Sequence, residues 1–198
     1  MTKPLELQTP VLLLAMPQVL DPFFHKSVVL LIHHQDEGSL GFIVNRPTGI
    51  KVSEILSGLE IPWQGDNSTM AFFGGPVQPQ LGTVLFRQPD DMPLDDEDSD
   101  HLTEIFPGAA MTQRIGDLEN LAEEPPGSFR FLLGYAGWGS GQLAQEIMRN
   151  DWLTAPVLDE LVFGESPEDV WSAALASVGI DPTQLPAWTE PGETPTAN

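Results

Sequence analysis

The sequence lacks several features that would each point to a particular chemistry. None of its 198 residues is a cysteine, which excludes disulfides, thiolate metal ligands and cysteine nucleophiles. Lysine and arginine together number eight, against 29 aspartates and glutamates, so the formal net charge is −21 at pH 7. A surface with so little positive charge repels the phosphates of nucleic acids and of anionic membranes. We therefore expect no direct contact with nucleic acid and none with a membrane.

Long hydrophobic runs are also absent. No stretch approaches the roughly 20 apolar residues that are needed to span a bilayer. The early apolar run Val11–Met16 is short and stops at Pro17, so a secretory signal peptide is not indicated. The lack of cysteine fits a reducing compartment. The sequence thus predicts a soluble cytoplasmic protein.

Apolar residues make up 41% of the chain, which is enough for one substantial core. Neither an internal repeat nor a clean linker divides the sequence, so we expect a single α+β domain over residues 1–188. Residues 189–198 are rich in Pro, Thr and Glu, and this composition predicts a disordered tail.

Strand signals dominate the first half of the chain. The apolar run Ser27–His34, a polar turn and the run Leu40–Asn45 predict a β-hairpin. Arg46-Pro47 is expected to end it, because proline has no amide hydrogen for a ladder. Further strands are expected at Val11–Ala15, at Met70–Val77 with a break at Gly74-Gly75-Pro76, at Gly82–Arg87, at Leu102–Thr112 as a hairpin turning at Pro107-Gly108, at Ser128–Ala136 and at Leu158–Phe163.

Helix signals are fewer and come mostly later. Helices are expected at Glu54–Leu59 with Ser53 as the cap, at Ile115–Glu123, at Ser140–Asn150 and at Ser166–Gly179 with Ser166 as the cap. Strands followed by mixed elements argue for an α+β fold rather than a doubly wound sheet. We expect hairpin-rich mixed β-sheets with a few flanking helices.

Four segments occur in a distinctive order along the chain. They are "LLAMPQVLDPFFHKSVVLLIHH" (Leu13–His34), "GSLGFIVNRP" (Gly38–Pro47), "GGPV" (Gly74–Val77) and "GYAGWGSGQLAQEIMRNDWL" (Gly134–Leu153). Together they closely resemble the YqgE/AlgH family of bacterial proteins of unknown function. The resemblance implies an α+β fold with coiled, bifurcated β-sheets. Some members of that family are labelled transcriptional regulators, although the net charge of this chain argues against direct contact with DNA.

Glycines are concentrated where a strand is expected to pass into a helix. Gly139–Ala144 reads Gly-Ser-Gly-Gln-Leu-Ala, which fits the loose G-x-G-x-x-A fingerprint of dinucleotide-binding enzymes. The alternative is structural, with Gly137, Gly139 and Gly141 permitting a sharp turn and close packing of main chain. We favour the structural interpretation, because a lone fingerprint is weakly specific and the N-terminal half contains hairpins instead of βαβ units.

The helix expected after these glycines carries a polar stripe. Gln142, Glu146 and Asn150 are spaced four residues apart and therefore share one face. With Tyr135 and Trp138 above the start of the helix, this face is suited to line a small-molecule pocket. The alternative is the solvated face of an ordinary amphipathic helix.

Asn45-Arg46-Pro47 follows a central strand, a position where functional groups often collect. Arg46 can hold an anion and Asn45 can bond a loop backbone; the structural alternative is a turn held by Asn45 and an ion pair at Arg46. We combine these features into one candidate surface for a ligand or a protein partner: Asn45, Arg46, Pro47, Gly74, Gly75, Pro76, Tyr135, Trp138, Gln142, Glu146 and Asn150.

The sequence pattern predicts no set of catalytic residues. A nucleophile paired with a base is not indicated, and the adjacent His33 and His34 point to opposite faces of a strand, which disfavours a shared metal. We assign no catalytic residue, no metal and no cofactor. The sequence favours a non-enzymatic binding or regulatory protein. The alternatives are a nucleotide-binding enzyme that uses Gly139–Ala144 and a transcriptional regulator that acts through a protein partner.

Overall fold

The computed structural model describes residues 7–88, 102–164 and 166–186, so the tail expected at 189–198 lies outside the described residues. The described part contains ten strands. They are β1 Val11–Ala15, β2 Val28–Gln35, β3 Gly38–Ile43, β4 Pro47–Lys51, β5 Met70–Phe73, β6 Val77–Arg87, β7 Thr103–Phe106, β8 Ala109–Thr112, β9 Phe129–Gly139 and β10 Trp152–Ala155. The helices are α1 Val52–Gly58, α2 Ile115–Glu123, α3 Gln142–Met148 and α4 Val170–Ser177, with a π-helical turn at Glu160–Gly164 and a 3₁₀ turn at Pro182–Gln184.

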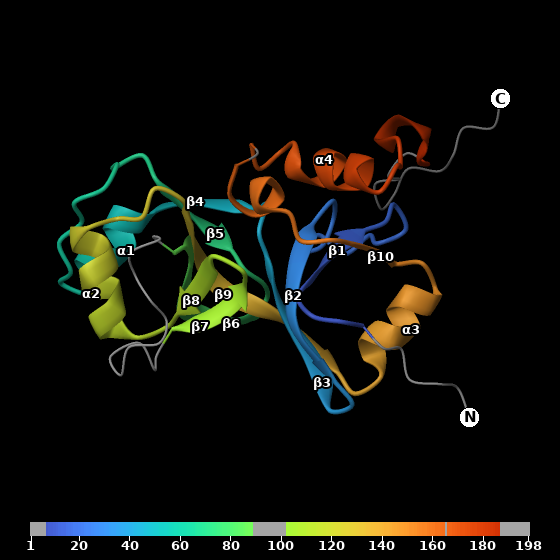
Figure 1. The fold of residues 1–198 in the computed structure, drawn as a ribbon, viewed down its shortest axis with the longest axis horizontal. Coiled ribbons are helices and arrows are strands. Elements are labelled where there is room, and N and C mark those ends of the chain that lie inside the picture. Colours follow the sequence, from blue (N-terminus) through green and yellow to red (C-terminus); the bar gives the residue numbers. More distant parts are fainter. Residues whose placement is uncertain (1–6, 89–101, 165, 187–198) are drawn as a thin grey trace.

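Strand β9 joins two halves of the sheet, whose strand order is β10-β1-β2-β3-β9-β6-β8-β7 (Figure 1). Its second half pairs antiparallel with β3, with Gly38 opposite Gly139 and Gly41 opposite Ala136. Its first half pairs antiparallel with β6 and parallel with β5, which in turn pairs with β4. The α+β fold with a bifurcated, hairpin-rich mixed sheet is therefore confirmed.

The sheet divides where glycines let main chain pack on main chain. Gly134 in β9 has a φ of +70°, and a Cβ there would lie 2.4 Å from the carbonyl oxygen of Gly75. A Cβ on Gly74 would lie 2.3 Å from the carbonyl oxygen of Gly134, closer than any side chain tolerates. Gly74 and Gly75 therefore have a structural role, and the close contact of main chain with main chain lies at Gly134 rather than at Gly137, Gly139 or Gly141.

Helices cover both faces of the half that contains β1, β2 and β3 (Figure 1). Leu12 and Leu30 face a buried cluster that includes Trp171 of α4, whereas the neighbouring Leu13 and Val29 face another that includes Leu143 of α3. Burial on both faces explains why these strands are continuous apolar runs instead of alternating ones. In the other half, α1 and α2 cover a third cluster against β5, β6, β8 and β9.

Three expected elements are corrected. Leu158–Phe163 is not a strand, since Glu160–Gly164 forms a π-helical turn with Leu161 and Val162 buried against the α4 cluster; a short apolar run fits either structure. Arg46-Pro47 does not end the pairing, because Pro47 opens β4, which among the described strands pairs only with β5 and thus leaves the proline at an edge.

The third correction concerns the helix starts. The N-cap of α1 is Lys51 and that of α4 is Asp169, and neither makes a side-chain cap bond. Ser53 lies inside α1, and Ser166 contributes only its carbonyl oxygen, to the amides of Asp169 and Val170. By contrast, α2 spans the expected Ile115–Glu123. Within the described ranges, each helix is too short or too polar to cross a membrane.

Candidate functional site

A cleft of about 270 Å³ lies among the end of β9, α3, the start of β10 and the loop from residue 16 to residue 27, which we call the β1–β2 loop. We call it the Trp–Glu cleft. One wall comes from Trp138, Gln142, Glu146, Arg149, Asp151 and Trp152, and the β1–β2 loop supplies Gln18, Val19, Leu20, Asp21 and Phe24 opposite them. Two segments that lie more than 110 residues apart in sequence therefore form one hollow.

The carboxylate of Glu146 is the polar centre of the cleft. Its Oε2 accepts hydrogen bonds from the indole Nε1 atoms of Trp138 and Trp152, each at 2.8 Å. Its Oε1 accepts a bond from Nε2 of Gln142 at 2.9 Å. All three donors are neutral, so the negative charge is hydrogen-bonded without being neutralised.

Aromatic rings form the floor beneath this carboxylate. The rings of Trp138 and Trp152 meet edge to face, with centroids 5.9 Å apart, and Phe24 meets Trp152 edge to face at 5.6 Å. The two tryptophans are only 6% and 4% exposed. Rings packed in this way fix each other's orientation, so the indole N–H groups are held in place for Glu146.

The start of α3 differs from the open phosphate cradle that the G-x-G-x-x-A fingerprint predicts. The amide of Gly139 donates to Oε1 of Gln142 at 3.0 Å, so a side chain of the protein already occupies it. Gly141 adopts a left-handed φ of +69° as the N-cap of α3, and that helix has only seven residues. The glycines here shape a turn, as the structural interpretation expects.

Charge in the cleft is mostly negative. Arg149, the one basic residue among the described residues that line it, forms an ion pair with Asp151 at 2.8 Å. Oδ1 of Asp21 accepts a hydrogen bond from the backbone amide of Phe23 at 2.8 Å. Three carboxylates against one guanidinium leave the lining with a formal charge of −2.

Asn45 and Arg46 bind the backbone of the β1–β2 loop and of the first residue of β2. Nδ2 of Asn45 donates to the carbonyl of Lys26, and its Oδ1 accepts the amide of Val28, both at 2.9 Å. Nη1 of Arg46 donates to the carbonyl of Pro22 at 2.7 Å, and Nη2 donates to that of His25. Asn45 thus bonds a loop backbone as expected, and among the described residues Arg46 binds carbonyls in place of the ion pair expected as its structural alternative.

Burial shifts the electrostatics of Arg46. Removal from water lowers the pKa of Arg46 from its ordinary value, and the nearby negative charge of Asp21 partly opposes that shift. Arginine stays protonated at physiological pH even so. A half-buried guanidinium bonded to loop carbonyls indicates a positioning role for Arg46.

The structure brings together only part of the surface expected from sequence. Trp138, Gln142 and Glu146 line the cleft, and the carbonyl of Asn150 accepts a bond from Nε2 of Gln18 at its edge. The other members lie elsewhere: Pro47 pairs with Phe72 in the sheet, Gly74 and Gly75 pack against β9, Pro76 is exposed before β6, and Tyr135 packs on the α4 side of the core.

Sequence reasoning missed Trp152 and the β1–β2 loop. Trp152 lies in the same motif as Trp138, and the presence of a tryptophan on either side of one short helix was a usable signal. No local pattern pairs Gln18, Asp21 or Phe24 with residues near position 140, because that contact depends on the sheet order.

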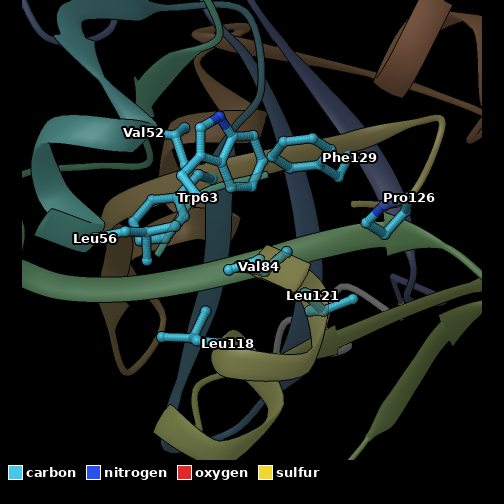
Figure 2. A pocket seen from close by; sticks show the side chains of 10 residues that line it. Val52, Leu56, Trp63, Val84, Leu118, Leu121, Pro126 and Phe129 are labelled. Atoms are coloured by element: carbon cyan, nitrogen blue, oxygen red, sulfur yellow. The ribbon is translucent and has the colours of Figure 1, made fainter. Parts of the chain in front are cut away.

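A second hollow lies in the other half of the molecule, between α1 and α2 (Figure 2). It is lined by apolar side chains, and its volume is only about 10 Å³, room for about one water molecule. Trp63 meets Phe129 edge to face there, with centroids 5.8 Å apart. This hollow is a gap in the core of that half, not a ligand site.

Comparison with known proteins identifies relatives along nearly the whole chain. The model of the AlgH-like family, DUF179, matches residues 12–183. A UPF0301 protein of Paracoccus denitrificans is 42% identical over 178 residues, which cover 88% of this chain and 91% of the relative. A UPF0301 protein of Myxococcus xanthus is 37% identical over 177 residues, covering 89% and 93%.

Two solved structures share the fold. The solution structure of the AlgH protein from Pseudomonas aeruginosa matches with a TM-score of 0.71 and 32% identity, covering 91% of this chain and 94% of that one. The crystal structure of protein DIP2367 from Corynebacterium diphtheriae also has a TM-score of 0.71, with 24% identity and 88% coverage of both chains. At that identity the second match supports the fold alone.

Proposed function

The chain belongs to the AlgH-like family. We propose that it is a non-enzymatic binding protein whose site is the Trp–Glu cleft. The observation that carries the proposal is the Glu146 carboxylate, held by three neutral N–H donors beside an aromatic floor. Small-molecule sites have this composition, with apolar walls and a few fixed polar groups.

The hydrogen bonding supports binding over catalysis. Three N–H groups occupy Glu146, Asp151 is paired with Arg149, and the Gly139 amide is paired with Gln142. Groups that are fixed in this way give a ligand a rigid surface, whereas a general base needs room to take a proton from its substrate. The same occupied amide makes the nucleotide-binding alternative the less supported one.

A fragment screen tests the cleft. We would record the indole N–H signals of ¹⁵N-labelled protein against a library of acidic, basic and uncharged fragments, and assign each signal with Trp→Phe variants. We expect hits that move the signals of Trp138 and Trp152 and leave that of Trp63 in place. Gln18→Phe, which fills the cleft, should abolish these shifts, whereas Gln64→Phe, an exposed site in the other half, should not. Hits that survive Gln18→Phe would contradict the proposal.

We further propose that occupancy of the cleft has a regulatory effect in the cytoplasm, exerted through a protein partner and without contact to nucleic acid. The net charge of −21 supports the last point. A gel-shift series with genomic DNA fragments, at sodium chloride concentrations from low to physiological, should show no complex with the purified chain. Salt-sensitive binding would overturn this part of the proposal.

A further inference from the structure

We propose that the ligand of the Trp–Glu cleft is a small organic cation, a primary amine or a guanidine on a short apolar stem. This inference rests on the proposed function, because it presumes that the cleft binds. It adds the sign of the ligand's charge and the group that recognises it. The argument uses the charge of the lining, the hydrogen bonding of Glu146, and the size of the cleft.

The charge of the lining selects against anions. Asp21, Glu146 and Asp151 contribute three negative charges, and Arg149 contributes one positive charge that Asp151 already pairs at 2.8 Å. An anionic ligand would meet the carboxylates of Glu146 and Asp21, of which Asp21 has a nearby guanidinium, that of Arg46. It would also meet the field of a chain with a charge of −21. A cation is attracted by both, and the attraction begins before contact.

Glu146 keeps its charge and part of its bonding capacity available. An ionised carboxylate offers about four lone-pair sites, and three are occupied by Trp138, Trp152 and Gln142. Since these donors are neutral, an incoming N–H⁺ group finds a full negative charge and an open site. The hydrogen bonds also fix the carboxylate in one rotamer, so a ligand loses little free energy in ordering it.

The apolar part of the cleft determines the chemical nature and the length of the ligand's stem. Phe24 supplies most of the accessible aromatic surface, because the two indole rings are only 6% and 4% exposed, and Leu20 on the β1–β2 loop is 48% exposed. Aromatic faces attract ammonium and guanidinium groups as well as alkyl carbon. The volume of about 270 Å³ lies just below the usual range for ligand sites, about 300 to 1,000 Å³, so we expect a short stem.

A matched set of probes tests the sign of the charge. n-Butylammonium, butylguanidinium, 1-butanol and butyrate share one stem and differ in their head group. We expect the two cations to move the indole N–H signals of Trp138 and Trp152 at concentrations where butanol and butyrate do not. Binding of butylammonium should weaken as sodium chloride is raised, because salt screens the carboxylates.

Two variants separate the contributions of the carboxylates. Asp21→Asn keeps the oxygen that accepts the Phe23 amide and removes the charge, and it should weaken butylammonium binding about two- to fivefold. Glu146→Gln removes the central charge and should weaken it about tenfold or more. Glu119→Gln, on the exposed face of α2 in the other half, makes the net charge less negative by the same amount and should leave binding in the Trp–Glu cleft unchanged.

The outcomes distinguish this inference from the proposed function. Shifts by both cations that Asp21→Asn weakens and Glu119→Gln does not would support it. If butanol or butyrate moves the two indole signals as strongly as the cations do, the cation inference is wrong, and the cleft remains a binding site. If the cations fail while fragments from the wider screen bind, the inference again fails alone. If no probe and no fragment moves these signals, both proposals fail.

Discussion

Glu146 holds one carboxylate between two indole N–H groups and one side-chain amide, at distances of 2.8 to 2.9 Å. The i, i+4 spacing of Gln142 and Glu146 follows from the helical repeat, so this contact is predictable from sequence. The bond from Trp138 is also predictable once the strand is known to lead into the helix. The bond from Trp152 is not, because it requires β10 to return beside β1.

Replacing Glu146 by Ala should lower the free energy of unfolding by about 2–4 kcal/mol. The substitution leaves two nearly buried indole N–H groups without their acceptor, and each unsatisfied group costs about 1–3 kcal/mol. Urea denaturation followed by circular dichroism measures the loss. Glu119→Ala, at an exposed position of α2, is the control and should change stability by less than about 0.5 kcal/mol. Equal losses in the two variants would contradict the central role of Glu146.

A methyl group added at Gly134 should lower the stability of the fold far more than one added at Gly116. Gly134→Ala places a Cβ 2.4 Å from the carbonyl oxygen of Gly75 at a φ of +70°, and we expect a loss of about 3 kcal/mol or more. Gly116→Ala, in α2 with nothing within 4 Å of the new Cβ, should instead stabilise by about 0.5–1 kcal/mol. Thermal denaturation of the pair measures both. A mild effect at Gly134 would show that the two segments can move apart.

Among the elements, the β1–β2 loop shows how the first half of the chain shapes the cleft. Arg46 and Asn45 bond the carbonyls of its residues 22, 25 and 26, while Phe24 turns toward Trp138 and Trp152. Phe23 stacks on Phe73 with centroids 5.5 Å apart. The loop is therefore anchored on two sides, and its wall of the cleft depends on residues that do not line the cleft themselves.

Arg46→Gln should loosen this loop without unfolding the sheet. Loss of two charge-assisted bonds to carbonyls should cost about 1.5–3 kcal/mol and speed hydrogen exchange across residues 17–27. Arg46→Lys should be intermediate, because a single ammonium lacks the fork geometry that reaches both carbonyls. Lys51→Gln at the end of β4 is the control. If hydrogen exchange across residues 17–27 is unchanged in the Arg46→Gln variant, the aromatic contacts are sufficient to hold the β1–β2 loop in place.

Sequence patterns predicted elements wherever the local signal was unambiguous. The continuous apolar runs of β1, β2 and β3, the Pro107-Gly108 turn and the amphipathic α2 were found near their observed bounds. The strands β4 and β10 were missed, because each carries a weak local signal and, in the part of the chain that the structure describes, pairs with a single neighbour. The π-helical turn was mistaken for a strand, since burial by α4 is a tertiary effect that the run Leu158–Phe163 does not reveal.

For the molecule as a whole, 29 acidic residues against eight basic ones make self-repulsion a general destabilising force. Raising sodium chloride from about 10 mM to several hundred mM shortens the Debye length from roughly 30 Å to well under 10 Å. We therefore expect the melting temperature to rise with salt. Calorimetry in a salt series measures it, and a neutral osmolyte series separates screening from water exclusion. A melting temperature independent of salt would show that the charges are too widely spaced to matter.

Strand β9 has residues in the Trp–Glu cleft and in the apolar gap between α1 and α2. Phe129 and Phe131, near the start of β9, line the apolar gap of Figure 2, and Trp138, near its end, lines the Trp–Glu cleft. Between them the strand is fixed by neighbours on both sides and by the contact at Gly134. Because the strand is held as one rigid element, we expect a twist imposed at one end to reach the other. Energetic effects of repacking Phe131 and of occupying the cleft should then fail to add, although the two sites share no contact.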